Sequence, residues 1–455
     1  MSQHLFLILY SLFFTLITWH KFHHGLFLLF LLLPTYLIRF NIGPLPTTLL
    51  EVMIWIICII WLIKIVNKKT ISYLLSFIYK HKLFLISIIL FLLAATISIF
   101  TSVDTHAALG QWKAFYIEPF LIFIILITTV NQQPSTNKNT SYKLLITSYI
   151  LPALIISGLI TSLLAIYQHF TGFLVPHAFW ANNETHRVTA WYGFPNGVGL
   201  FLAPLVPFAL YLVITKFKEL KTTNIEYRIW NIIIIISCLL SLVSLPLAIF
   251  YSKSTGGLIG TLAGIGLLLL IYKKTRLITV AVGIVGLVSL ASLPQLSNIK
   301  QELLFQDRSG QIRLSIYNET WQFLKDHPIA GAGLASYSEK IKSYHTTVNG
   351  EGIEIFHHPH NIFLTIWVNL GLLGLIGFIL ILVTGYRLLV TDFKKNRQIP
   401  LTNYFLIASL TTILITGLVD SPYIKNDLSV FFWMLIALAL VTQNKSANVD
   451  TLEKK

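Results

Sequence analysis

Long apolar runs alternate with short polar segments along nearly the whole chain. The runs lie near 5–19, 25–38, 49–66, 83–100, 115–130, 144–168, 197–215, 230–251, 256–272, 277–293, 361–383, 403–419 and 428–442. A helix of about 20 apolar residues crosses a bilayer core about 30 Å thick, so the pattern predicts about 12 or 13 transmembrane helices. The first two runs are short, and 20-HKFHHG-25 between them is either a hairpin turn or an interfacial break.

Composition agrees with this class of protein. The 455 residues are 55% hydrophobic and only 11% charged, with a mean hydropathy of +0.74, which excludes an ordinary soluble domain. We therefore expect an all-α integral membrane protein. The first apolar run lacks a basic leader and a small-residue cleavage site, so we expect a retained helix rather than a signal peptide. Cys58 and Cys238 lie inside apolar runs and are expected to be buried hydrophobic residues, with no disulfide and no metal spacing.

The formal charge of +15 sorts by loop and predicts the orientation. Lysine and arginine gather near 64–82, 138–143, 216–228, 273–276 and 387–397, which are alternate loops, and the C-terminal tail is basic too. The positive-inside rule makes these segments cytoplasmic. The polar stretches 131–140 and 443–455 are expected to be a flexible cytoplasmic loop and a disordered tail. The remaining loops then face outward, at 101–113, 169–196, 252–255, 294–360 and 420–427.

The loop 294–360 is the one sizeable outward segment. Within it, 311-QIRLSIYNETWQFLKDHP-328 has apolar residues at helical spacing, which predicts an amphipathic helix on the membrane surface. Pro328 ends that helix, 331-GAG-333 supplies a turn that needs backbone freedom, and 334–345 forms a second amphipathic piece. The expected organisation is thus 1–293 transmembrane, 294–360 outward helical loop, 361–442 transmembrane and 443–455 tail.

Three histidines in four residues, 357-HHPH-360, stand where the next apolar helix begins. Asn361 is a favourable N-cap, and a helix N-terminus attracts anions. A zinc site is the alternative for H-H-x-H, but adjacent histidines rarely point at one ion and Pro359 stiffens the segment. Only Glu351 and Glu354 are nearby carboxylates in the sequence. Farther along, 371-GLLGLIG-377 has a glycine at every third residue, which indicates close helix packing rather than chemistry.

Several of these stretches together resemble the O-antigen ligase and polymerase superfamily. They are 313-RLSIY-317 with a following tryptophan, 327-HPIAGAG-333, 360-HNIFLTIWVNLGLLG-374, 187-RVTAWYGFPNGVGLFLAP-204, 252-SKSTGG-257 and 420-DSPYIKND-427. The resemblance implies a glycosyltransferase that moves an oligosaccharide or polysaccharide from undecaprenyl diphosphate to an acceptor. The acceptor would be a glycolipid of the lipid A-core kind, a cell-wall glycan or a protein, and the site would face outward from the bacterial cytoplasmic membrane, without a cofactor or metal. A polymerase that extends the lipid-linked glycan stays open.

The resemblance also assigns roles to residues. Arg187 and Arg313 match positions that bind the diphosphate, for which guanidinium groups are well suited, while Arg308 is a competitor of Arg313. His360 is the expected base that takes the proton of the acceptor hydroxyl. Weaker substrate-binding candidates are Lys253, Asn361, Tyr423 and Lys425.

Three further expectations come from the residues themselves. Glu118 is an intramembrane carboxylate, expected either to have a function or to pair with Lys113. Asn196 is expected to shape a turn or to cap a helix. A membrane transporter is the alternative class, but it would place ionisable residues at mid-membrane and repeat its halves, and we find no internal repeat.

Overall fold

The structure is a computed structural model that describes residues 3–43, 45–129, 145–182, 185–221, 225–348, 350–394 and 400–452. The chain is 79% helical, and its sheet consists of two short antiparallel hairpins in these residues. Six helices are long and apolar enough to cross a membrane, and two bent helix pairs also reach that limit. The predicted class, an all-α integral membrane protein, is confirmed.

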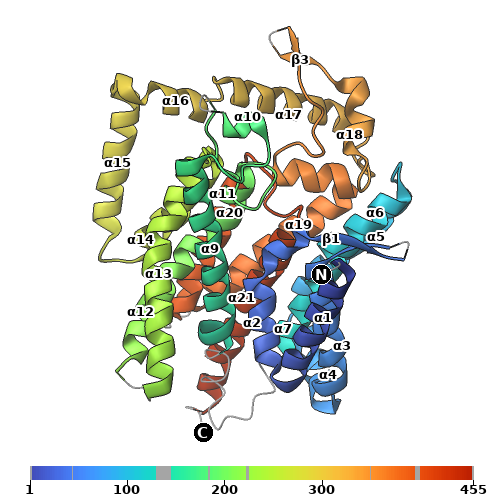
Figure 1. Ribbon diagram of the computed structural model, residues 1–455, viewed down its shortest axis with the longest axis vertical. Helices are drawn as coiled ribbons and strands as arrows, with labels where there is room; N and C mark the ends of the chain where they lie inside the picture. Colours follow the sequence, from blue (N-terminus) through green and yellow to red (C-terminus); the bar gives the residue numbers. More distant parts are fainter. Residues whose placement is uncertain are drawn as a thin grey trace.

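The first half of the chain supplies helices to both sides of the bundle, as Figure 1 shows. Its elements are α1 (Gln3–His20), α2 (Phe22–Leu31), η1 (Leu33–Leu37), β1 (Arg39–Ile42), β2 (Leu45–Thr48), α3 (Leu49–Lys64), α4 (Lys68–Lys80), α5 (Lys82–Phe100), α6 (Thr105–Trp112), η2 (Lys113–Ile117), α7 (Glu118–Thr129), η3 (Ile146–Ile150), α9 (Leu151–Thr171), α10 (Ala178–Ala181), α11 (Asn196–Leu202), η4 (Ala203–Leu205) and α12 (Val206–Glu219). Side chains of Thr48, Asn67 and Asp104 cap the starts of α3, α4 and α6.

The second half completes the bundle and adds a layer across one end of it. Its elements are α13 (Ile225–Tyr251), α14 (Thr255–Ile271), α15 (Arg276–Ser292), η5 (Pro294–Leu296), α16 (Ser297–Leu303), α17 (Arg308–Asp326), α18 (Tyr337–Lys340), η6 (Ile341–Tyr344), β3 (Thr347–Val348), β4 (Glu351–Gly352), α19 (Ile362–Lys394), α20 (Leu401–Thr416) and α21 (Asn426–Leu452). Asp307 caps α17 by accepting bonds from two backbone N–H groups. The predicted amphipathic helix is therefore present.

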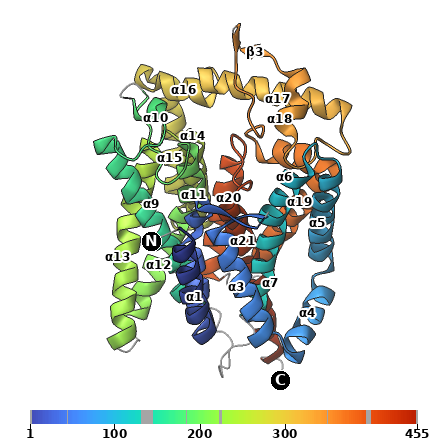
Figure 2. The same cartoon turned by 45° about the vertical axis from the view of Figure 1, so that its right-hand side comes forward.

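The helices pack side by side, and their two ends differ in character. α19 lies along α5, α14 along α20, and α13 along α9. Figure 1 shows α10, α16, α17 and β3 at one end, with α4 and the C-terminus at the other. Figure 2 shows α16 and α17 crossing that first end like a lid on the bundle. We call α16 to β4 the cap. The alternating basic loops predict that the cap faces outward, and this orientation stays a prediction.

Three apolar runs depart from the helices expected of them. α2 ends at Leu31, and Pro34 stands in the first turn of the following 3₁₀ helix, so a helix of 10 residues replaces the expected run 25–38. It is about 15 Å long, roughly half of a bilayer core. α19 is kinked at Gly371, so the run 361–383 is not one straight helix. α21 continues to Leu452, which puts a helix in most of the stretch expected to be a disordered tail.

Two glycine turns fix the cap onto α19. Gly331 and Gly371 both have left-handed backbone conformations, with φ of 64° and 69°. A Cβ on Gly331 would lie 2.5 Å from the carbonyl oxygen of Val368, and a Cβ on Gly371 would lie 2.0 Å from that of Ile329. Only glycine fits these mutual approaches. The predicted turn at 331-GAG-333 is confirmed, and the expected glycine packing on α19 is confirmed at Gly377, which packs against the Phe91 backbone.

The cap forms a small core together with Val368 of α19; its members from the cap are Phe323, Leu324, Ala332, Tyr337 and Ile341. Figure 1 shows α15 standing beside the bundle, and none of its residues is buried. Both cysteines are buried in helices, as expected.

Candidate active site under the cap

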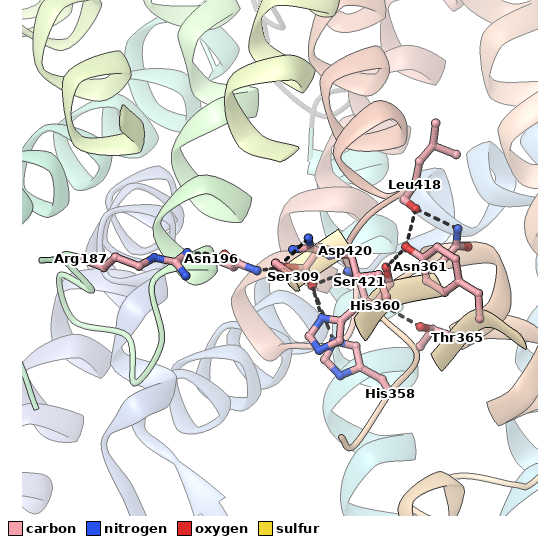
Figure 3. Close-up of polar contacts among 12 residues, drawn as sticks. Arg187, Asn196, Ser309, His358, His360, Asn361, Thr365, Leu418, Asp420 and Ser421 are labelled. Atoms are coloured by element: carbon pink, nitrogen blue, oxygen red, sulfur yellow. Dashed lines mark hydrogen bonds and ion pairs between the residues drawn. The ribbon is translucent and has the colours of Figure 1, made fainter. Parts of the chain in front are cut away.

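A buried carboxylate, Asp420, lies at the centre of a polar cluster between α20 and α21. Its side chain is 6% exposed, and its Oδ1 atom is 3.4 Å from Nδ1 of His360 and 3.7 Å from Nε2 of His358. The backbone N–H of Ser421 donates to the same oxygen at 2.8 Å. Burial alone would raise the pKa of the Asp420 carboxyl, but hydrogen bonds from both histidines lower that pKa well below its usual range. The carboxylate is therefore ionised, and Figure 3 shows both rings pointing toward it.

The position of His360 is set by its neighbours on three segments. Its backbone has a φ of 49°, and its carbonyl accepts a hydrogen bond from the Tyr317 hydroxyl at 2.9 Å. That hydroxyl is also 3.0 Å from the carbonyl oxygen of Leu418. An ionised Asp420 only accepts hydrogen bonds, so Nδ1 of His360 must carry the hydrogen, which leaves the lone pair on Nε2. This is the tautomer that a base needs.

Asn361 begins the next helix, as the sequence predicts. Its Oδ1 accepts from the backbone N–H groups of Phe363 and Leu364 at 3.0 and 3.1 Å, and its Nδ2 donates to the carbonyl of Leu418 at 3.0 Å. The amide thus joins the start of α19 to the segment that carries Asp420. Both ends of the Asn361 amide are engaged in hydrogen bonds within the protein, which gives this side chain a structural role.

The other two histidines differ from each other. His358 is half-buried, and burial lowers the pKa of its imidazole, an effect that the nearby Asp420 partly opposes. His357 is exposed and lies outside the cluster. His358, His360 and Asp420 each offer a ligand atom, and these atoms lie within 4.8 Å of one another, so the set could hold a metal ion. The sequence did not show this set, because its carboxylate comes from the loop between α20 and α21 rather than from Glu351 or Glu354.

Arg187 reaches the cluster from the opposite side. Its Nε donates to the carbonyl of Ser252 at 2.9 Å, and its Nη2 donates to Oδ1 of Asn196 at 3.0 Å and to the carbonyl of Lys253 at 3.2 Å. Burial lowers the pKa of the guanidinium to about 10, and the like charge of Arg313 adds to this. The charge of Arg313 is thus felt at Arg187. Nη1 of Arg187 makes none of the hydrogen bonds found in the described residues, and it is available to an anion.

Arg313 comes from the middle of α17, where its Nη1 donates to Oγ of Ser309 at 2.9 Å. Its remaining guanidinium N–H groups make no hydrogen bond within the described parts of the chain, so it retains donors for a phosphate. Arg308 instead pairs with Glu351 at 2.7 Å in an exposed contact, with side chains 76% and 66% exposed. Of the two candidates on this helix, Arg313 lies one turn before Tyr317, whose hydroxyl donates to the His360 carbonyl.

The remaining predicted residues occupy different places. Lys253 donates from Nζ to the carbonyl of Thr185 at 2.7 Å. The ammonium of Lys425 lies 4.0 Å above the ring of Phe194, and burial lowers its pKa although Asp427 and Asp420 raise it. Both lysines border the cluster. Tyr423 does not, because the structure buries it completely in the core, where its hydroxyl donates to the Phe115 carbonyl at 2.8 Å.

Sequence reasoning missed three residues of the cluster. Asp420 and Tyr317 lie in motifs of the sequence analysis, but the sequence assigned neither of them a role. Asn196 was expected only to shape a turn or to cap a helix. Its Nδ2 donates to Oδ2 of Asp420 at 2.9 Å, so this amide connects Asp420 to Arg187. A signal existed for Tyr317, since it follows Arg313 by four residues and so shares its helix face. No pattern in the sequence indicated the contact of Asp420 with the histidines.

The expected pair of Glu118 and Lys113 is replaced by other partners. Lys113 pairs with Glu51 at 2.8 Å, and Glu118 accepts a hydrogen bond from the indole of Trp55 at 2.9 Å. Asn426 also donates to Glu51 at 2.9 Å. These groups form a separate polar network inside the bundle, below the cluster around Asp420.

Fold and site together define a multi-pass membrane protein with a basic, histidine-containing centre at one end of its helix bundle. Residues 239–379 match the family described as O-antigen ligase, which confirms the relationship predicted from the sequence motifs. This segment contains Lys253, Arg313 and His360, whereas Arg187 and Asp420 lie outside it. The matched segment is less than a third of the chain.

A protein of Haemophilus influenzae, named only as uncharacterized, is 26% identical over 291 residues. The match covers 58% of this chain and 63% of that protein, less than two thirds of its length. Its name describes no activity.

Proposed function

We propose that this protein is a glycosyltransferase that moves a glycan from undecaprenyl diphosphate to an acceptor hydroxyl at the outer face of the bacterial cytoplasmic membrane. The observation that carries this proposal is the meeting of two arginine charges with a partly buried histidine and a buried carboxylate under the cap. A diphosphate leaving group needs fixed cations, and an acceptor hydroxyl needs a base. The cluster supplies both at one end of a membrane bundle.

The donor diphosphate is proposed to bind between Arg187 and Arg313. Arg313 retains enough guanidinium donors for a two-point contact with phosphate oxygens, and Arg187 offers Nη1. Lys253 and Lys425 add positive charge at the border of the cluster. The mutual repulsion of the two arginines, felt in the lowered pKa of Arg187, would be relieved when an anion binds between them.

His360 is proposed to act as general base through Nε2. As the acceptor oxygen forms its bond to the anomeric carbon, that carbon loses its bond to the phosphate oxygen, and the acceptor proton passes to Nε2. Asp420 then stabilises the imidazolium through Nδ1–H, as carboxylates commonly do for catalytic histidines. The electron pair leaves with undecaprenyl diphosphate, whose charge the arginines neutralise.

In this proposal the cations of the site are side chains, and no metal is required. The surrounding positive charges of Arg187, Arg313 and Lys425 disfavour a divalent cation at the histidines. The acceptor is proposed to be a lipid A-core-like glycolipid, a cell-wall glycan or a protein. If the acceptor is itself a lipid-linked glycan, the same chemistry makes the enzyme a polymerase.

The test uses purified full-length protein in nanodiscs, a defined undecaprenyl-diphosphate-linked oligosaccharide and a panel of these acceptors. We expect stoichiometric release of undecaprenyl diphosphate and a glycosylated acceptor by mass spectrometry, both lost in His360→Ala. Movement of the intact donor across a sealed vesicle membrane without any chemical change would instead establish a transporter. Absence of any transfer product with every acceptor would overturn the proposal.

A further inference from the structure

We propose that Asn196 is a positioning residue that couples the donor-binding arginine to the carboxylate behind the base. This inference rests on the proposed function, and it assigns to Asn196 a role that neither the motifs nor the family match provides. Its basis is a continuous chain of hydrogen bonds that crosses the site, from Arg187 through Asn196 and Asp420 to His360 (Figure 3).

The chain has a defined direction at each step. Nη2 of Arg187 donates to Oδ1 of Asn196 at 3.0 Å, and Nδ2 of Asn196 donates to Oδ2 of Asp420 at 2.9 Å. The other carboxylate oxygen accepts from Nδ1 of His360 at 3.4 Å. Only one orientation of the amide satisfies both neighbours, because a guanidinium offers only donors and an ionised carboxylate offers only acceptors.

An asparagine suits this position for electrostatic as well as geometric reasons. An aspartate at 196 would place two carboxylates 2.9 Å apart, and an apolar residue would leave Asp420 and Arg187 without this partner. The neutral amide lets a cation and an anion share one bridge without forming a direct ion pair. Arg187 therefore keeps Nη1 for the donor, and Asp420 keeps Oδ1 for the histidines.

The backbone of Asn196 is held as firmly as its side chain. Asn196 starts α11, a helix whose following residues are all buried, and a Cβ at Gly197 would lie 2.8 Å from the ring of Tyr192. The amide cannot follow a displaced partner by moving the helix. An anion that draws Arg187 toward itself therefore acts on the bond between Asn196 and Asp420, and so on the placement of His360.

A double-mutant cycle tests this coupling. Arg187→Lys, Asp420→Asn and the double variant are measured for kcat/KM of the lipid-linked donor in nanodiscs, first in the parent chain and then with Asn196→Leu. This substitution keeps the branched shape of the side chain but forms no hydrogen bonds. In the parent chain we expect the two changes to be non-additive by about five- to tenfold. With Asn196→Leu the coupling should fall below about twofold. Asn196→Leu alone should both raise the donor KM and lower kcat.

Gln168→Leu provides the matched control. This buried amide also bridges segments of the outer loop that carries Arg187, since it donates to the carbonyl of Ala190 and accepts from the backbone N–H of Thr189. It contacts neither Arg187 nor Asp420. We expect this variant to change the donor KM through looser packing but to leave the coupling between Arg187 and Asp420 intact.

The same cycle is repeated on the Kd for undecaprenyl diphosphate, which requires no turnover. Additive effects in the parent chain, or coupling that survives Asn196→Leu, would overturn the role of Asn196 while leaving the proposed function standing. A parent protein that neither binds undecaprenyl diphosphate nor turns over its glycan would overturn the proposed function, and the inference with it.

Discussion

Replacing Asp420 with asparagine isolates the contribution of one negative charge at the base. In the parent chain the carboxylate accepts the hydrogen of Nδ1 of His360. The amide of Asp420→Asn can present its NH₂ group to Nδ1, which moves the ring hydrogen to Nε2 and removes the lone pair that receives the acceptor proton. The imidazolium that forms during transfer also loses its counter-charge.

The size of the loss follows from the geometry. Two unit charges 3.4 Å apart interact with about 5 kcal/mol at an effective dielectric constant of about 20, which is an upper bound for this pair. The imidazole is 19% exposed, so water screens part of this charge–charge interaction. We therefore take about 3–4 kcal/mol for its contribution. At about 1.4 kcal/mol per factor of ten, kcat should fall by about 10²–10³.

Single-turnover release of undecaprenyl diphosphate measures this step directly. The affinity for the donor should change only to the extent that Asn196 couples Asp420 to Arg187. The matched control is Asp326→Asn, which removes an exposed carboxylate that accepts a hydrogen bond from the Tyr344 hydroxyl in the cap. We expect it to retain the parent rate. If Asp420→Asn keeps more than about a third of the parent kcat in well-folded protein, Asp420 does not support the base and the reasoning is refuted.

Four further outcomes are expected. Arg313→Lys keeps the charge but loses the planar fork, so the donor KM should rise about tenfold, and an unchanged KM would remove Arg313 from the donor site. His360→Ala should lower kcat by about 10²–10⁴ with donor binding kept, whereas His357→Ala should stay near the parent, and the reverse order would exclude His360 as the base. Activity should survive EDTA, while loss with rescue by zinc or manganese would assign the two histidines and Asp420 to a metal. In intact cells Ser343→Cys should react with an impermeant thiol reagent and Lys69→Cys should not; labelling at 69 would invert the proposed orientation.

Hydropathy predicted the helices well because each apolar run reports a local property, the burial of a continuous segment in lipid or in the bundle. The expected helix over 311–328 appears as α17, and the glycines of 331-GAG-333 do adopt left-handed conformations. Gly371 was harder, since a glycine that packs helices and a glycine that breaks one look alike in sequence. The kink depends on the carbonyl of Ile329, which lies far away along the chain.

The residues of the candidate site also divide into those that a local motif indicates and those that depend on how distant segments pack. Arg187, Arg313 and His360 could be proposed from the sequence because they stand in recognisable local motifs, and their roles stay predictions. Asp420 could not be paired with His360 from the sequence, because their contact depends on how α20 packs beside the start of α19. Tyr423 was misplaced for the opposite reason, since its polar neighbours in 420-DSPYIKND-427 concealed a side chain that turns into the aromatic core.

The interlocked turns at Gly331 and Gly371 bear on how mutational screens of this protein should be interpreted. A side chain at either glycine collides with a backbone carbonyl of the other segment, so the cap turn or the first half of α19 must shift. That half begins two residues after His360. Such variants would mimic the loss of a catalytic group without touching one, and they would do so in protein that still inserts and folds. An inactive variant at either glycine is thus no evidence for a chemical role of that residue. It indicates instead that the chemistry depends on a rigid connection between the cap and α19.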